Sequence, residues 1–171
     1  IISSYPRYSG SLLSMPISKQ VLDYFEDQKK FFSYLPSSIA KDTVVRLYPH
    51  DYSWFQKDRW AKSFPESSID NCDEDFNTAL SNSSIVISGW NTTTYLESLA
   101  ADIPTVIFWD SKYFELKDEA KEYFEQLEKV KIFHKNPYSA ANHVQDIWEN
   151  IDEWWNQSEV IKARENFTRK Y

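Results

Sequence analysis

The segment Ser84-Ile-Val-Ile-Ser-Gly-Trp-Asn-Thr-Thr-Thr-Tyr-Leu-Glu-Ser-Leu-Ala-Ala-Asp-Ile-Pro-Thr-Val-Ile-Phe-Trp109 decides the fold. Its two apolar runs, residues 85–87 and 105–109, are typical of buried parallel strands. Between them, residues 91–94 can cap a helix, because their side-chain oxygens can accept the free N–H groups of a first turn. Such a unit places a hydroxyl-rich turn and a helix N-terminus at the carboxyl edge of a parallel sheet, where anionic ligands bind.

The rest of the chain alternates strand and helix patterns. Strands are predicted at residues 1–4, 43–48, 68–71 and 131–134, the third weakly. Helices are predicted at residues 19–35, 52–64, 73–81 with Asp73 as the cap, 114–130, from Asn136-Pro137 to Trp155, and 160–170. Repeated alternation favours a doubly wound α/β domain, with Val44–Leu47, Ile85–Ile87 and Val106–Phe108 as buried parallel strands.

The composition narrows the class of protein. The chain has 171 residues, a net charge of −7 and one cysteine, Cys72. The acidic balance argues against a general nucleic-acid binder, and one cysteine excludes an intrachain disulfide framework and a cysteine-based zinc cluster. Histidines and carboxylates show no metal-ligand spacing, so we expect no metal. No apolar run approaches the ~20 residues that span a bilayer, and two glycines are too few for a glycine-rich dinucleotide fingerprint.

Residues Asn91-Thr92-Thr93-Thr94-Tyr95-Leu96-Glu97, followed by Ile103-Pro104, resemble the donor-site signature of glycosyltransferases with the GT-B fold. From near Ile2 to Tyr171, the chain is more closely similar to a family of surface-carbohydrate-biosynthesis transferases. The segments that carry this similarity are Tyr5-Pro-Arg-Tyr-Ser9, Arg46-Leu-Tyr-Pro-His-Asp-Tyr52 and Thr105-Val-Ile-Phe-Trp109. The resemblance implies a reaction class, glycosyl transfer from a nucleotide sugar, and no particular substrate.

The resemblance also implies roles for individual residues. It assigns the donor phosphate to the turn and helix N-terminus formed by Asn91, Thr92, Thr93 and Thr94, and the ribose hydroxyls to Glu97. From the residues alone, the threonines could instead be an ordinary helix cap, and Glu97 a solvated helix residue. The sequence identifies no catalytic residue.

Three cationic side chains are further candidates for the donor phosphate. Arg7 and His50 each follow a predicted strand, at the edge where ligands bind. His50 resembles the His-Pro turns of some CMP-sugar transferases, although the order here is Pro-His. Arg46 could clamp an anion or pair inside the sheet. Arg7 as a surface residue and His50 as a backbone-bonded loop residue remain alternatives.

Together these observations predict a single Rossmann-like, doubly wound nucleotide-sugar-binding domain over residues 1–171, the C-terminal half of a GT-B fold. Because Ile1–Ser4 reads as a strand already under way, we expect a longer chain. A missing N-terminal domain would bind a glycan or lipid-linked acceptor, and helices within residues 137–171 would pack on either domain. The predicted function is metal-independent glycosyl transfer in bacterial surface polysaccharide biosynthesis, in the cytoplasm or peripheral to the inner membrane, with no cofactor.

Two alternatives remain open at this stage. The first is a sugar-nucleotide epimerase-like enzyme of the same fold, which would need catalytic carboxylates and further His or Arg residues across the cleft. The second is a non-catalytic nucleotide-binding or scaffold domain. Binding of a nucleotide would separate the scaffold from the two enzymes.

Overall fold

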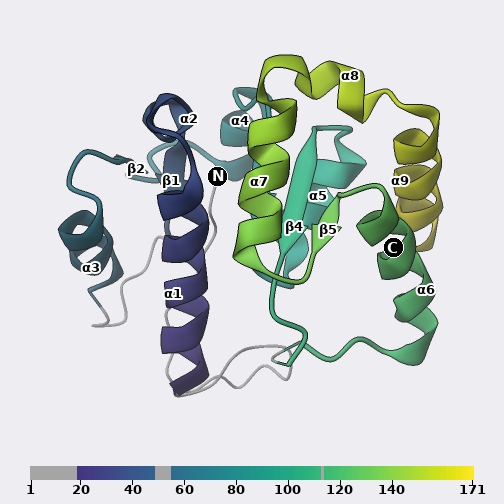
Figure 1. Cartoon of the computed structure of the whole chain (residues 1–171), viewed down its shortest axis with the longest axis horizontal. Coiled ribbons are helices and arrows are strands. Elements are labelled where there is room, and N and C mark those ends of the chain that lie inside the picture. Colours follow the sequence, from purple (N-terminus) through teal and green to yellow (C-terminus); the bar gives the residue numbers. More distant parts are fainter. Residues whose placement is uncertain (1–18, 49–54, 113) are drawn as a thin grey trace.

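The structure, a computed structural model, describes residues 19–48, 55–112 and 114–171 (Figure 1). The strands are β1 (Val44–Arg46), β2 (Ser68–Asp70), β3 (Val86–Ser88), β4 (Thr105–Phe108) and β5 (Phe133–His134). The helices are α1 (Lys19–Tyr34), α2 (Ser37–Asp42), α3 (Gln56–Ser63), α4 (Phe76–Ser81), α5 (Thr93–Ala100), α6 (Asp118–Lys129), α7 (Pro137–Ile147), the 3-10 turn η1 (Trp148–Asn150), α8 (Ile151–Trp155) and α9 (Ser158–Lys170). The predicted strand Ile1–Ser4 and the candidates Arg7 and His50 lie outside the described residues.

All the strand pairs in the described residues are parallel. β1 pairs with β2, and β3, β4 and β5 pair in that order. The prediction of a Rossmann-like α/β fold with parallel strands is therefore confirmed. Two details differ: the described strands form two sheets where the sequence predicts one, and Val44, predicted to be buried, is 43% exposed.

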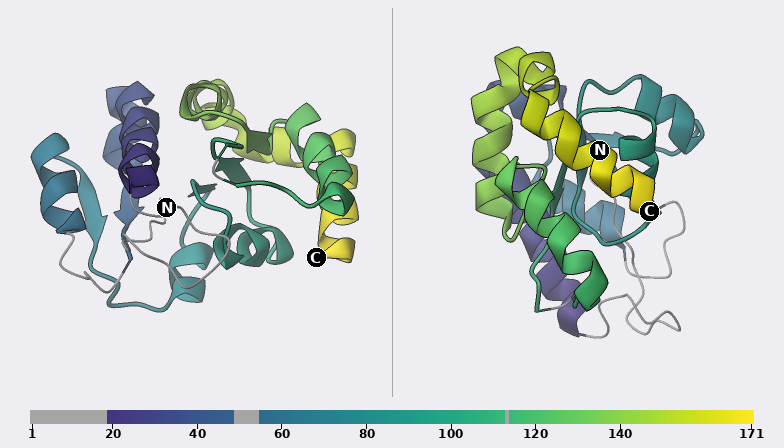
Figure 2. Two further views of the ribbon diagram at one scale, coloured as in Figure 1. Left: turned by 90° about the horizontal axis from the view of Figure 1, so that it is seen from below. Right: turned by 90° about the vertical axis from the view of Figure 1, so that its right-hand side faces the viewer.

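Helices cover both faces of the larger sheet. α7 packs on β4 and β5, whereas α5 packs on β3 and β4. Seen from below, α1 and α7 lie on one side of the strands and α5 on the other (Figure 2, left). Every residue of β3 and β4 is consequently buried, which explains why these segments are almost continuous apolar runs.

The C-terminal helices are joined to the same core at the corner between α5 and β4. Asp102 lies in that corner with a left-handed φ of 58°. Its carboxylate accepts a hydrogen bond from the Trp155 indole at 3.1 Å and forms an ion pair with Arg164 of α9. The Arg164 guanidinium also lies 4.4 Å from the centre of the Trp155 ring. These contacts hold α9 against the α5–β4 corner.

Among the predicted boundaries that are wrong, three have an identifiable physical cause. α4 is capped by Asp75, which accepts a hydrogen bond from the Thr78 N–H at 2.8 Å, so the predicted cap Asp73 lies before the helix. α6 begins at Asp118, because the predicted first residue, Phe114, is buried against the ring of Trp90. The long helix predicted from Asn136-Pro137 to Trp155 is interrupted by η1, where the backbone tightens before α8 begins.

Helix α1 holds the turn that follows β3. Gln28 is buried and donates a hydrogen bond from its amide to the Gly89 carbonyl at 3.2 Å. One turn earlier, Tyr24 packs edge-on against the buried Trp90, with ring centres 4.5 Å apart. A Cβ atom at position 89 would overlap the side-chain amide of Gln28. Glycine is thus required here by close approach, and its φ is not in the left-handed region.

We predict that Gly89→Ala lowers the free energy of unfolding by about 1–3 kcal/mol, because the added methyl group must displace the Gln28 amide. Without the overlap, the same change would stabilise the protein by about 0.4–1 kcal/mol, because alanine lowers the conformational entropy of the unfolded chain. Chemical denaturation of the variant measures the difference.

Gln28→Ala provides the control background for this experiment. Because the overlapping amide is then gone, Gly89→Ala should cost much less in that background than in the wild type. Equal costs in both backgrounds would show that the contact with Gln28 is not the reason for glycine at position 89.

Candidate functional site

The candidate site is built on the short turn between β3 and α5. Ser88 donates a hydrogen bond from its hydroxyl to the Trp90 carbonyl at 3.2 Å, and the Thr92 N–H donates to the same carbonyl at 3.0 Å. Trp90 itself is buried beneath the turn. Anchored in this way from the core side, the turn presents Asn91 and the threonines at the carboxyl end of β3, as the sequence predicts.

No described side chain caps the N-terminus of α5. Thr92 occupies the cap position with an extended backbone, but its side chain makes no capping hydrogen bond. Its hydroxyl lies instead 3.4 Å from that of Thr94, while Thr93 is exposed. A helix N-terminus carries oriented N–H groups and a partial positive charge, so this end of α5 is suited to an anionic ligand.

Asn91 and Glu97 flank this helix end. The Asn91 side-chain carbonyl accepts a hydrogen bond from the Tyr95 hydroxyl at 2.9 Å, which ties the turn to the first turn of α5. Glu97 lies one turn further along and is exposed. A carboxylate there can accept hydrogen bonds from ligand hydroxyl groups without first breaking contacts in the core.

A cavity of about 340 Å³ adjoins the turn. It lies between α5, the N-terminal half of α6 and the end of α9, and Asn91 is on its wall. Its aromatic lining consists of Tyr95, Phe124, Phe167 and Tyr171. Burial raises the pKa of the Tyr95 hydroxyl, so this group stays protonated and donates to Asn91 at neutral pH.

The hydrogen bonds and the ion pair described for Arg46 are to residues outside this turn. Its guanidinium forms an ion pair with Asp70, the residue opposite it in the β1–β2 ladder. It also donates to the Glu74 carbonyl at 2.7 Å. An anion would have to compete with both partners, so a phosphate-binding role for Arg46 stays a prediction. Arg7 and His50 lie outside the described residues, and their role stays a prediction.

Two buried histidines, His134 and His143, line a second cavity of about 560 Å³ beside β5 and α7. The Lys131 carbonyl accepts from Nε2 of His134 at 2.9 Å, so Nδ1, 2.7 Å from the Ser139 hydroxyl, is the unprotonated nitrogen that accepts. Neither ring nitrogen of His143 has a hydrogen-bond partner among the residues that the structure describes, and its ring packs against Trp154. Burial lowers the pKa of His134 to about 4 and that of His143 to about 3.

Two features that the described residues lack bear on function. No group of three or more His, Cys, Asp or Glu side chains in this part of the chain could hold a metal ion. None of the helices in the described ranges is both long and apolar enough to cross a membrane. The expected independence of the reaction from a metal stays a prediction.

Comparison of the chain with models of known protein families indicates the general class of its activity. A family model described as "LIC12162 family transferase" matches residues 1–171. The chain belongs to the LIC12162 transferase family. Searches of curated proteins and of solved structures found no match to this chain. The family supports a transferase activity in general, which agrees with the predicted reaction class at that level.

The sequence does not reveal the side chains that position the site in this transferase. Gln28 is separated from Gly89 by 61 residues, and a lone glutamine in a helical pattern looks like a surface residue. Trp90 and Tyr95 look like ordinary core aromatics in the sequence. The sequence offered one signal of the close contact, which is Gly89, one of only two glycines. In the structure its φ is not in the left-handed region, so a turn does not explain the glycine.

We predict that the buried histidines make stability fall as the pH drops from 7 to 5. The pKa of each is lower in the folded chain than the ordinary value of about 6.5, so below pH 6.5 the unfolded chain binds more protons. Each histidine should then remove up to about 1.4 kcal/mol of unfolding free energy per pH unit, and the loss is absent above that range. Denaturation at several pH values measures this slope.

His143→Phe is the matched variant, because phenylalanine keeps a ring against Trp154 and cannot be protonated. It should reduce the slope between pH 7 and 5, where most carboxylates remain ionised. A slope identical to that of the wild type would contradict the prediction.

Proposed function

We propose that this LIC12162 family transferase binds a nucleotide sugar at the N-terminus of α5 and forms the donor-binding part of a GT-B glycosyltransferase. One observation carries the proposal: an N-terminus without a side-chain cap directly follows the buried strand β3, with hydroxyl groups around it and Glu97 one turn along. Membership of a transferase family supports the reaction class. The resemblance to surface-carbohydrate enzymes supports surface polysaccharide biosynthesis as the context.

In this proposal the donor phosphate lies on the end of α5. Glycosyl transfer leaves negative charge on that phosphate, and preorganised N–H groups with the positive end of the helix dipole stabilise it. The hydroxyls of Thr92 and Thr94 are close enough together to contact the same group. Arg7 and His50 remain the predicted cationic partners. No step requires a metal ion, because the leaving charge is met by these groups.

Glu97 and the neighbouring cavity would bind the rest of the donor. The exposed carboxylate of Glu97 can accept from two vicinal ribose hydroxyls. The cavity behind Asn91 has aromatic walls that suit a planar or apolar part of a ligand. The proposal assigns neither the acceptor site nor a catalytic base to the described residues. Both would lie in another part of the protein.

Titration calorimetry with UDP, GDP and CMP tests the proposal directly. Saturable binding of one nucleotide, with much weaker binding of its nucleoside, is the expected result, because the phosphate supplies most of the contacts at a helix N-terminus. Absence of binding to all three would favour the non-catalytic scaffold and overturn the proposal.

We predict that Glu97→Gln and Thr94→Val each weaken binding of the preferred nucleotide by roughly 10-fold or more, since hydrogen bonds to charged groups contribute about 1.5–3 kcal/mol. Glu97→Gln should weaken the nucleoside as well, because it acts on the ribose. Thr94→Val should weaken the nucleotide more than the nucleoside, because it acts on the phosphate. His50→Ala should act on the same ligand, most strongly where His50 is charged.

Exposed positions on other helices provide matched controls. Glu125→Gln on α6 and Thr78→Val on α4 make the same chemical changes away from the turn. They should leave both dissociation constants unchanged. Wild-type affinity in Glu97→Gln, Thr94→Val and His50→Ala, with unchanged melting temperatures, would place the donor site elsewhere.

A further inference from the structure

The cavity beside β5 and α7 has a buried polar side chain without a partner on its wall. His143 lines this cavity and is only 4% exposed. Neither of its ring nitrogens has a hydrogen-bond partner in the described part of the chain. A buried polar atom without a hydrogen bond is costly, so each such atom in a native structure needs an explanation. A ligand that supplies the missing bond is one such explanation.

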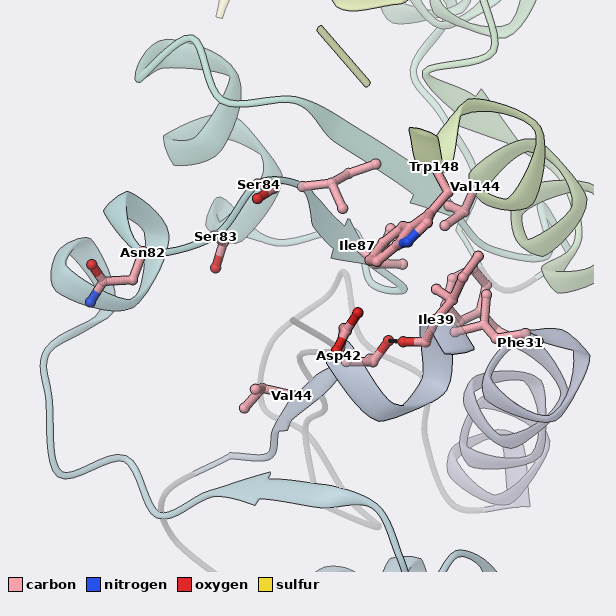
Figure 3. A pocket seen from close by; sticks show the side chains of 13 residues that line it. Phe31, Ile39, Asp42, Val44, Asn82, Ser83, Ser84, Ile87, Val144 and Trp148 are labelled. Carbon is pink, nitrogen blue, oxygen red and sulfur yellow. Dashed lines mark hydrogen bonds between the residues drawn. The ribbon is translucent and has the colours of Figure 1, made fainter. Parts of the chain in front are cut away.

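Two other cavities lack a group of this kind. A cavity of about 360 Å³ lies between α1, β3 and α7, where apolar side chains such as Phe31, Ile87 and Val144 gather (Figure 3). None of the residues given for its lining, or for the lining of the cavity beside Asn91, has a buried polar atom without a described partner. The imidazole of His143 therefore distinguishes the cavity beside β5 from these two.

The α7 wall of the cavity beside β5 is a polar stripe. Ser139, Asn142 and Asp146 all line the cavity, and their spacing of three and four residues places them on one face of the helix. All three are exposed, and the buried His143 lies next to them in the chain. Within the described residues, the side chains of Asn142 and Asp146 have no hydrogen bond or ion pair, so both are available to a ligand.

The charges around this cavity sum to zero. Its lining includes two ammonium groups, Lys131 and Lys135, and two carboxylates, Glu128 and Asp146. Lys135 and Glu128 form an ion pair at 2.6 Å. Both histidines are neutral at pH 7, because burial lowers their pKa values to about 4 and about 3. An anion would meet the two carboxylates and a cation the two ammonium groups, so the lining favours a neutral ligand.

The available groups are a mixture of hydrogen-bond donors and acceptors. The Lys131 ammonium only donates, the Asp146 carboxylate only accepts, and the Asn142 amide and the neutral imidazole of His143 each do both. A hydroxyl group also donates and accepts. A neutral ligand with several neighbouring hydroxyls can therefore satisfy all of these groups at once, and a sugar ring is such a ligand.

We propose that the cavity beside β5 and α7 binds a sugar ring, whose hydroxyls bond to Asn142, Asp146 and the imidazole of His143. The cavity volume of about 560 Å³ is typical of small-molecule sites. Because the ring nitrogens of His143 are closed to water, the exposed side chains beside it must move when the sugar enters. The described lining includes no residue of the turn after β3, so this site goes beyond the proposed donor site and does not depend on it.

Nuclear magnetic resonance of the full, isotope-labelled chain tests the proposal with glucose, galactose, mannose and N-acetylglucosamine. Saturable binding of at least one sugar is the expected result, together with a shift of the His143 ring nitrogens, because they gain a partner. Binding of none of the four, or binding that leaves the His143 signals unchanged, would overturn the proposal. So would a shift of these signals by inorganic phosphate or Mg²⁺ at lower concentration than by any sugar, because the site would then be ionic.

Substitutions in the polar stripe locate the bound sugar. Asn142→Ala and His143→Phe should each weaken sugar binding by roughly 5-fold or more, the usual effect of losing a neutral hydrogen bond. Asn77→Ala, at an exposed position of α4, is the matched control and should have no effect. If His143→Phe does not fold, the exposed positions decide: unchanged affinity in both Asn142→Ala and Asp146→Ala would overturn the proposal.

A second pair of measurements separates this site from the donor site. Thr94→Val should leave sugar affinity unchanged, and Asn142→Ala should leave nucleotide affinity unchanged. Loss of sugar binding in Thr94→Val would place the sugar at the end of α5 and overturn the proposal for the cavity beside β5. Sugar binding at that cavity without binding of any nucleotide would overturn the donor site alone.

Discussion

The parallel pairing of β3 with β4 is the constraint on which the rest of the structure depends. Parallel neighbours cannot be joined by a tight turn, so the chain must return along the sheet, and α5 is that return segment. The helix therefore begins at the carboxyl edge, at Thr93, after the turn that contains Gly89 and Trp90. Because α7 covers the other face of β4, the strands are buried on both sides and are apolar. The position of the turn and the orientation of the α5 dipole follow from the same parallel pairing.

The sequence predicted an element correctly where the pattern that defines it lies within one short segment, and less well where contacts with distant segments decide. The runs Ile85–Ile87 and Val106–Phe108 are continuous and apolar, and Asn136-Pro137 is a strong helix start, so β3, β4 and the start of α7 were predicted correctly. Asp73 and Asp75 offer the same capping chemistry, and the choice between them depends on where the chain enters α4. Phe114 left the predicted α6 because tertiary contact with Trp90 outweighed helical spacing.

The residues of the candidate site also fall into those predicted from a local pattern and those that depend on tertiary contacts. Asn91, the threonines and Glu97 lie at the predicted helix end because the strand–helix–strand pattern is local. Arg46 could equally have been a ligand residue or a strand partner, and only the tertiary structure reveals Asp70 opposite it. The contact between Gln28 and Gly89 depends on the crossing of α1 over the turn, which no local pattern records. Local spacing thus predicted the place of Asn91, the threonines and Glu97 in the fold, whereas the contacts that support their turn came from distant segments.

The ion pair between Asp102 and Arg164 has a consequence for synthesis of the protein. The corner between α5 and β4 receives its partners, Trp155 and Arg164, from the last quarter of the chain. While a ribosome still holds that segment, the corner lacks these contacts and the rings of Trp155 and Phe167 cannot yet cover the core. The final packing of the domain therefore has to wait until Trp155 and Arg164 have left the ribosome, and the nascent chain passes through a stage with exposed apolar surface that chaperones recognise.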